Sequence, residues 1–426
     1  MMTGRFVLAR RAIAVALAGA SIVVPTSASI AALTAASIAS LMTVSTCALA
    51  AAGTSAPPSA VSSPAAPSSA ASSAASSSAA VPSASSAASS SAAPHDYRDK
   101  NFDYFVSGDP RSPRAAHTEF LLALMGGGGS VDAAYRAIAS HAGGGHIVIL
   151  RAVHDDSFDP QSGDYGESFM KEWGPVTSAQ TIVFHHREAS YDPRVLAALR
   201  GADGIFLAGG DQANYVNYWK GTPVQEILNA HVRAKRPIGG SSAGLAILGH
   251  YSYTSLDGGS MESKVALADP FDSGVTLEGD FLHFRWLENV ITDTHFSRRC
   301  RLGRLIVFIA RLDQEHPRAD VFGVGIDERS ALLIGADGIG RMAQGSAGTA
   351  WVVMPRLHQK LVHGQPLTLE DIRIVRVDQS GSVDFKTRAV SHPLAQTVDS
   401  IEHGNPTHES IATPILRRSV VPANEG

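Results

Sequence analysis

Short continuous runs of apolar residues recur along the chain, and segments with helical spacing lie between them. The apolar runs are residues 120–125, 146–150, 181–184 and 204–208, and a short segment, residues 236–240, leads directly into Ser241-Ser242. The helical patterns are residues 131–141, 191–199 and 224–234. Runs of this kind predict strands buried on both faces, and their alternation with helices predicts an α/β fold. We therefore expect a three-layer αβα sandwich around a mostly parallel sheet.

Glycines follow three of the predicted strands at their carboxyl ends. They are Gly126 to Gly129, Gly209-Gly210 and Gly239-Gly240. Ligands of such sheets bind beyond the carboxyl ends of the strands. Taken singly, these glycines could serve only tight turns. Two of the three runs lead into polar residues of catalytic type, so we expect the functional site at this edge of the sheet.

Residues 240–244, Gly-Ser-Ser-Ala-Gly, fit the G-x-S-x-G pattern between a strand and a helix. This sharp turn holds its central residue, Ser242, above the sheet edge and directs the next backbone N–H, that of Ala243, toward an oxyanion. A serine at this position could instead only cap the helix. The strand–turn–helix context favours a nucleophile.

A serine hydroxyl is a weak nucleophile and needs a base. Among 17 histidines, His295 has the most informative context, because it follows a short apolar strand pattern and precedes a helix. An acid is then expected to orient the imidazole. A further predicted strand, residues 323–326, ends in Asp327 and Glu328. Strand side chains alternate, so one carboxylate could reach the cleft while the other faces away.

The first 50 residues predict an export signal. Three arginines precede an apolar run at residues 12–24, and small residues suited to cleavage lie near 27–29 and near 48–50. The mature protein is then expected in the periplasm or outside the cell, or tethered to the envelope, without stable insertion in a membrane. An uncleaved anchor is the alternative, and Cys47 faintly resembles a lipid attachment site.

The rest of the chain divides by composition. Residues 51–95 are almost only Ala, Ser and Pro, and they predict a disordered linker because they cannot bury enough surface to fold. Residues 96–394 form the expected catalytic domain. Within it, residues 350–354 and 372–377 predict strands near the main sheet or in a small appended one. Residues 395–426 show little pattern and predict a loose tail.

Charge and cysteine content narrow the class of protein further. The net charge of −4 does not suggest a nucleic-acid partner. If Cys47 leaves with the signal, Cys300 is the only thiol that stays. An exported protein with a large core can fold without a disulfide. No metal or other cofactor is expected.

Four segments in order resemble the cyanophycinase family, serine peptidases of the same clan as aspartyl dipeptidase. They are residues 208–215 (AGGDQANY), 238–249 (IGGSSAGLAILG), 293–305 (DTHFSRRCRLGRL) and 323–334 (GVGIDERSALLI). The resemblance implies a flavodoxin-like fold similar to that of class I glutamine amidotransferases. It also implies a triad of Ser242, His295 and Glu328. The order Ser, His, acid differs from that of the α/β-hydrolases, which disfavours an esterase.

The resemblance also implies roles for residues around the triad. Backbone N–H groups of Gly210 and Ala243 would form an oxyanion hole. The positions that match substrate-binding residues are Asp211, Gln212, Asp293, Thr294, Arg299 and Arg304. A guanidinium suits this role because it can grip a carboxylate with two hydrogen bonds. Arg304 could instead pair with a buried acid, and Arg301 is expected at the surface or in an interface.

The substrate of this family is cyanophycin, a polyaspartate with arginine attached to each side-chain carboxylate, which is released as β-aspartyl-arginine. This chain departs from the family pattern at Thr294, where Gln is usual, and at Ser241, where Thr is usual. We therefore expect cleavage of cyanophycin or of a related aspartyl peptide. The alternative is a non-catalytic exported protein that binds acidic peptides. Relatives often form dimers, so a homodimer is an open expectation.

Overall fold

The computed structural model describes residues 96–153, 165–355 and 360–407, all within one compact unit. The predicted export signal with Cys47 and the linker to residue 95 lie outside the described residues, as does the end of the chain from residue 408. The expectations for these parts stay predictions. Within the ranges described, no helix is both long enough and apolar enough to cross a membrane.

The centre of the larger sheet is parallel, as the apolar runs predict. Five strands pair in parallel in the order β5 (Ser178–Phe184), β4 (His146–Ala152), β6 (Gly204–Leu207), β7 (Ile238–Ser241) and β3 (Leu122–Met125). Nearly all of their residues are buried, which explains why their sequences read as continuous apolar runs.

Antiparallel strands extend this sheet on both sides, so that eleven strands belong to it within the described residues. On one side lie β2 (Phe102–Gly108) and β1 (Tyr97–Arg98). On the other side lie β12 (Ala331–Ile334), β13 (Ile339–Met342), β16 (Ser382–Asp384) and β17 (Val390–Ser391). The parallel arrangement is therefore confined to the five central strands, which are the ones that carry the Gly-rich ends.

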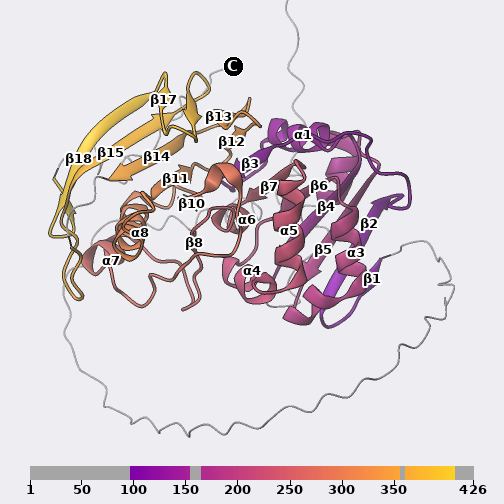
Figure 1. Cartoon of the computed structure of the whole chain (residues 1–426), viewed down its shortest axis with the longest axis horizontal. Coiled ribbons are helices and arrows are strands. Elements are labelled where there is room, and N and C mark those ends of the chain that lie inside the picture. Colours follow the sequence, from indigo (N-terminus) through magenta and orange to yellow (C-terminus); the bar gives the residue numbers. More distant parts are fainter. Residues whose placement is uncertain (1–95, 154–164, 356–359, 408–426) are drawn as a thin grey trace, which may run out of the picture. The chain divides into compact units, whose positions relative to one another are not determined.

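Helices cover both faces of the central strands (Figure 1). Leu122 and Leu124 of β3 face a core with α3, α4 and α5, whereas Ala123 and Met125 face a core with α1. This alternation confirms the predicted αβα sandwich. The predicted helices agree with α1, α3 and α5 to within two residues at each end.

The α-helices described are α1 (Asp132–His141), α2 (Tyr165–Ser168), α3 (Pro193–Gly201), α4 (Gln212–Trp219), α5 (Pro223–Arg233), α6 (Ala243–Ala246), α7 (Ser263–Ala268) and α8 (Leu302–Glu315). The shorter helical segments are the π-helical η1 (Phe169–Trp173) and the 3₁₀-helical η2 (Arg187–Tyr191) and η3 (Arg285–Leu287).

A second sheet carries the other predicted catalytic strands. Its order is β10 (Val290–Asp293), β11 (Phe322–Ile326), β14 (Ala350–Pro355), β15 (Leu369–Val377), β18 (Ala395–Glu402) and β19 (Asn405–Pro406). Only β10 and β11 pair in parallel among these described strands. Helix α8 packs on this sheet in an apolar core of its own. A short pair, β8 (Ser252–Tyr253) and β9 (Leu277–Glu278), lies apart from both sheets.

The predicted loose tail is wrong for its first residues. Strand β18 begins at Ala395 and pairs antiparallel with β15, and β19 follows it. Asp399 and Ile401 of β18 are buried, while Val398 is exposed. A strand that buries so few apolar side chains leaves a weak alternating pattern in the sequence. Residues 350–354 and 372–377, predicted as strands near the main sheet or in an appended one, are strands β14 and β15 of this second sheet.

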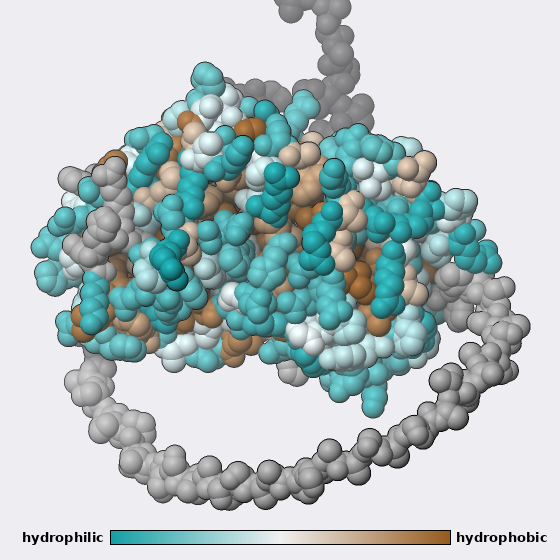
Figure 2. Space-filling view, in the orientation of Figure 1, coloured by the Kyte–Doolittle hydropathy of each residue, from teal (hydrophilic) through white to brown (hydrophobic). Residues whose placement is uncertain are grey.

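Apolar side chains gather in the cores, and the face shown in Figure 2 is mainly hydrophilic. The large apolar side chains exposed in the described residues are Tyr191, Leu256, Val265, Val362, Leu394 and Val398. They come from different elements and loops. The features that can carry chemistry therefore lie at the strand ends, not on an apolar surface.

Candidate active site

Three predicted side chains meet where strands from the two sheets end. Ser242 follows β7, His295 follows β10 by two residues, and Glu328 follows β11 by two residues. The Ser242 Oγ lies 2.8 Å from His295 Nε2, and His295 Nδ1 lies 2.7 Å from Glu328 Oε1. The structure thus brings together the residues that the sequence predicts as nucleophile, base and acid, in a line of hydrogen bonds.

The backbone at Ser242 is that of a sharp strand-to-helix turn. Its φ of 54° and ψ of −121° lie where a side chain rarely fits, a conformation typical of functional sites. Gly244 lets the turn pass close to β6, because a Cβ there would lie 2.1 Å from the Leu207 carbonyl oxygen. Ser242 is the N-cap residue of α6, yet its side chain makes no capping hydrogen bond. The hydroxyl points to His295 instead, which argues against a mere capping role.

The glycine run after β3 lies directly against these three side chains. A Cβ at Gly127 would lie 2.7 Å from His295 Cε1 and 3.0 Å from Ser242 Cβ. A Cβ at Gly128 would lie 2.6 Å from Glu328 Cδ. Both glycines have φ in the left-handed region, at 81° and 72°. No other residue type fits here without displacing the imidazole or the carboxylate.

The same glycine run holds the backbone of the two loops that carry His295 and Glu328. The Gly126 carbonyl accepts a hydrogen bond from His295 N at 2.9 Å, and the Gly127 carbonyl accepts one from Arg329 N at 2.8 Å. The sequence reveals these glycines only as a turn. Their role in positioning the base and the acid depends on pairing between β3 and elements about 170 to 200 residues further along the chain.

Asp327 and Glu328 face opposite sides, as strand alternation predicts. The carboxylate of Asp327 accepts hydrogen bonds from Ser297 N at 3.0 Å, from Thr349 N at 2.9 Å and from Trp351 Nε1 at 3.2 Å. It is buried and ties the loop after His295 to β14. Glu328 is the carboxylate that faces His295.

The electrostatic surroundings keep His295 in its neutral form. Burial lowers the pKa of the imidazole, and the positive charges of Arg299 and Arg301 lower it further, although the hydrogen bond to Glu328 opposes them. Because Nδ1 faces the carboxylate, the neutral ring leaves Nε2 free to accept a proton. Nε2 is the nitrogen that faces Ser242.

Asp293 and Arg304, both predicted to bind substrate, form a buried ion pair with each other. Their predicted role is therefore corrected. Arg304 is only 1% exposed, and its Nε and Nη2 lie 2.8 and 2.5 Å from the two oxygens of Asp293. Burial would raise the pKa of Asp293, but the charges of Arg304 and Arg301 hold it below its usual value. Neither side chain reaches a surface that a substrate could contact. The structural alternative for Arg304 is the correct one.

Arg301 and Thr294 belong to the same buried cluster. Arg301 Nη1 donates to Thr294 Oγ1 at 2.9 Å and to the Thr294 carbonyl oxygen at 3.0 Å. Burial lowers the pKa of Arg301 to about 9. The expectation that Arg301 lies at the surface is wrong, and Thr294 does not face a substrate. This cluster cannot be predicted from the sequence, because its side chains come together only when α8 packs on β10.

The remaining predicted contacts lie at the strand-end edge. A Cβ at Gly209 would lie 3.6 Å from Ser242 Cβ, so the loop that carries Gly210 runs beside the nucleophile. Asp211 is exposed and caps α4 by accepting from Ala213 N at 2.9 Å. Gln212 donates to the Tyr253 carbonyl oxygen at 3.3 Å. Arg299 is exposed.

A cavity of about 360 Å³ opens beside Ser242 and His295. One wall is formed by Gly127 to Ser130, and another by residues that the sequence reading did not single out: Tyr135, Tyr165, Ser168 and Trp173. Aromatic residues at helical spacing predict core packing, and Tyr135 and Trp173 are indeed buried. Only the contact of α1 and η1 with the strand ends shows that they also line a site.

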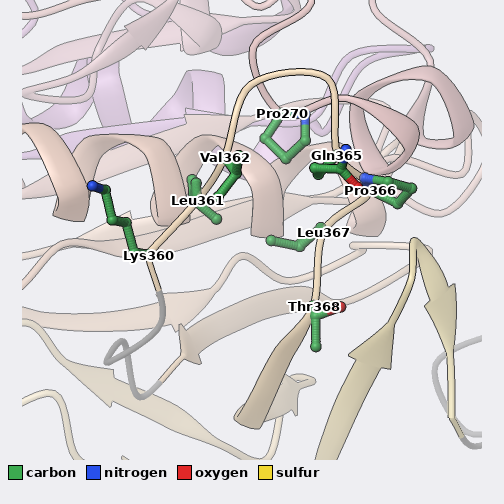
Figure 3. Close-up of a pocket in the computed structure, with 8 residues that line it drawn as sticks. All are labelled: Pro270, Lys360, Leu361, Val362, Gln365, Pro366, Leu367 and Thr368. Carbon is green, nitrogen blue, oxygen red and sulfur yellow. The ribbon is translucent and has the colours of Figure 1, made fainter.

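A second hollow, of about 350 Å³, shares none of its described lining residues with this cavity (Figure 3). It is lined by Pro270, Lys360, Leu361, Val362, Gln365, Pro366, Leu367 and Thr368. Ser242, His295 and Glu328 are not among its lining residues. Within the described part of the chain, no group of three or more His, Cys, Asp or Glu side chains could hold a metal ion.

An α/β fold that joins a serine, a histidine and a glutamate by hydrogen bonds is typical of serine hydrolases. Comparisons with known proteins identify the family. Residues 161–276 match the model of Peptidase family S51. Cyanophycinase from Trichormus variabilis is 30% identical over 277 residues, which cover 62% of this chain and 84% of that protein. Cyanophycinase from Synechococcus elongatus is 28% identical over 256 residues, covering 58% of this chain and 73% of that protein. The chain belongs to the cyanophycinase family of S51 peptidases and is a serine-type peptidase.

A solved structure of a peptidase from an acI-B1 actinobacterium aligns with 59% of this chain and 98% of that one. The two are 15% identical, with a TM-score of 0.38.

Proposed function

We propose that this protein is an exported peptidase that hydrolyses cyanophycin, or a related β-aspartyl peptide, through an acyl-enzyme on Ser242. The observation that carries the proposal is the line of hydrogen bonds from Ser242 through His295 to Glu328. The named activity of the curated relatives supports the substrate class. The arginine-bearing start and apolar run of the sequence support export.

In this mechanism His295 Nε2 takes the proton from Ser242 Oγ while the oxygen attacks the scissile carbonyl carbon. The resulting oxyanion is held by the N–H groups of Gly210 and Ala243. Glu328 stabilises the imidazolium and keeps the ring oriented. His295 then protonates the leaving amine as the carbon–nitrogen bond breaks. A water molecule, deprotonated by His295, attacks the ester and releases the acid product.

The buried Asp293–Arg304 pair limits how the substrate carboxylates can be bound. Cationic and amide groups that remain at the cleft edge are Arg299 and Gln212, and we assign the acidic part of the substrate to them. The departure at Ser241, which lines the cavity beside Ser242, favours a specificity that differs in detail from that of the relatives. The charge of an exposed arginine next to His295 also attracts an anionic peptide.

Cleavage products decide between cyanophycin and other aspartyl peptides. The purified protein should be incubated with cyanophycin, with β-aspartyl dipeptides and with the matching α-aspartyl dipeptides, and the products identified by mass. We expect β-aspartyl-arginine from cyanophycin, because the main chain of the polyaspartate is cut while the bond to arginine stays intact. The Ser242→Ala variant should fold and lose on the order of 10⁴- to 10⁶-fold in kcat. No cleavage of cyanophycin, or release of free arginine from it, would overturn the substrate assignment.

The rival reading, a non-catalytic protein that binds acidic peptides, makes the opposite prediction for the same experiment. It predicts binding of the peptides without turnover, and equal behaviour of wild type and Ser242→Ala. Export is tested separately by fractionating cells that express the full chain. We expect the processed protein outside the cytoplasm, and an unprocessed cytoplasmic protein would contradict this part of the proposal.

A further inference from the structure

Two neighbouring carboxylates at the end of β11 differ in how firmly they are held. Five hydrogen bonds to the carboxylate of Asp327 come from Ser297, Thr349 and Trp351. Within the described residues, the hydrogen bonds and ion pairs of the Glu328 carboxylate are one contact with His295 and one with Arg298. The acid of the proposed triad therefore depends on two side chains for its orientation.

The two contacts lie on different oxygens of Glu328. Oε1 lies 2.7 Å from His295 Nδ1, and Oε2 lies 3.3 Å from Arg298 Nε. The last side-chain torsion of a glutamate has only a broad preference, so a carboxylate that is held at one oxygen can turn. A positive charge beside Oε2 attracts that oxygen and opposes the rotation. Oε1 is then kept on the imidazole.

The loop that carries Arg298 is anchored by the other carboxylate. Ser297, the residue before it, donates from N and from Oγ to Asp327 Oδ1, at 3.0 and 2.5 Å. The Cys300 N–H donates to the Ser297 carbonyl oxygen at 3.2 Å and closes a tight turn. Two consecutive residues of this loop thus contact two consecutive residues after β11, which brings Arg298 to Glu328.

Arg298 lies outside the cavity where a substrate would bind. It is not among the described residues that line the cavity beside Ser242, and its side chain is 72% exposed. Exposed ion pairs contribute little to the free energy of folding. Replacing Arg298 should therefore leave the fold intact and change mainly the orientation of Glu328.

We propose that Arg298 is a positioning residue, which holds Oε2 of Glu328 so that Oε1 stays on the imidazole of His295. The inference rests on the proposed function, because it gives this arginine an effect on the activation of Ser242. It assigns Arg298 no contact with the substrate. Its effect on the reaction must therefore pass through Glu328.

The rate at which a fluorophosphonate labels Ser242 measures this activation without a peptide substrate. We expect Arg298→Gln to slow labelling by about 3- to 5-fold, the upper part of the range for an exposed ion pair, and to lower kcat on β-aspartyl peptides equally while KM stays within about twofold. Arg298→Lys should keep most of the rate, because it keeps a charge within reach of Oε2. The matched control is Arg111→Gln, which removes an arginine that is 56% exposed and lies 3.0 Å from Asp109. It should label like wild type.

The same change in a Glu328→Gln background tests whether the effect passes through the carboxylate. Because the amide carries no charge, we expect Arg298→Gln to cause no further loss there. An equal loss in both backgrounds would overturn the inference. So would a changed KM with an unchanged labelling rate, which would make Arg298 a substrate contact.

The low-field proton resonance of His295 Nδ1–H reports its hydrogen bond to Glu328 and needs no turnover. Its absence from His295→Gln assigns it. We expect a sharp resonance in wild type and Arg298→Lys, and one broadened by exchange with water in Arg298→Gln. A wild type that does not react with the fluorophosphonate would overturn the proposed function, while this resonance would still test the inference. A resonance that Arg298→Gln leaves unchanged would overturn the inference.

Discussion

At the scale of single residues, Gly128 shows how closely the backbone is fitted to the proposed catalytic groups. It has no side chain to take part in chemistry, and a Cβ there would lie 2.7 Å from both Cγ and Oε2 of Glu328. The second carboxylate oxygen, Oε2, lies 3.3 Å from Nε of the exposed Arg298. A side chain at position 128 would clash with Glu328, and we expect the carboxylate to shift away from its place beside His295.

The change Gly128→Ala tests this support. The new methyl group would lie 2.6 Å from Glu328 Cδ, so we expect the carboxylate to shift and kcat to fall by about 10- to 100-fold with a smaller change in KM. The control is Gly364→Ala. Gly364 has a φ of 68°, close to the 72° of Gly128, but its Cβ would meet nothing within 4 Å. Both variants carry about 1 kcal/mol or more of backbone strain, so equal kcat values for the two would contradict a role in positioning Glu328.

The sequence reveals the reacting residues better than the residues around them. Ser242, His295 and Glu328 each follow the end of a strand, and the end of a strand can be predicted from the residues around it. The pairing of Arg304 with Asp293, and the place of Tyr165 in the cavity wall, are decided by which helix packs on which strand. A buried ion pair and a substrate-binding pair have the same residue types in the sequence, so only the packing distinguishes them.

At the scale of elements, a hydrogen bond joins helix α5 to the start of β7, the strand that leads to Ser242. His231 of α5 is buried, and its Nε2 donates a hydrogen bond to the Pro237 carbonyl oxygen at 3.0 Å, just before β7. Burial lowers the pKa of His231 to about 3. The folded protein therefore keeps this imidazole neutral at pH values where the unfolded chain protonates it.

This difference predicts an acid-sensitive contribution to stability. Below pH 6.5 the unfolded state binds a proton that the folded state does not, so the free energy of unfolding falls by up to about 1.4 kcal/mol per pH unit until about pH 3. In His231→Gln the amide can replace the N–H donor without titrating. We expect this variant to lose less stability than wild type between pH 7 and pH 4.5, measured by urea unfolding. The exposed His117→Gln is the control, and equal acid sensitivity of all three proteins would contradict the assignment.

The sequence predicts some helices and strands more clearly than others. The five parallel strands are buried on both faces, and four of them are predicted from apolar runs, whereas β7 (Ile-Gly-Gly-Ser) is indicated by the glycines and the turn at its end. Strand β18 lies next to the two-residue edge strand β19 and buries chiefly Asp399 and Ile401 within a polar stretch, so its sequence resembles a loop. Its place is fixed by hydrogen bonds to β15, which form between main-chain atoms and leave no signature in residue type.

At the scale of the whole molecule, the proposed catalytic line joins two sheets. Ser242 comes from the end of a strand in the eleven-stranded sheet, whereas His295 and Glu328 follow parallel strands of the six-stranded sheet. Strand β3 and the glycine run after it connect the two, because the run contacts all three side chains. The chain order Ser, His, acid follows from this arrangement, since the second sheet is formed later in the sequence.

The central claim is that Ser242 is a nucleophile activated by His295. Labelling with a fluorophosphonate, followed by mass analysis of the digested protein, tests it most directly. The account predicts a single adduct on the peptide that contains Ser242, no adduct in Ser242→Ala, and much slower labelling in His295→Gln. Labelling of Ser242→Ala to the same extent as wild type, or no labelling of the folded wild type, would contradict it.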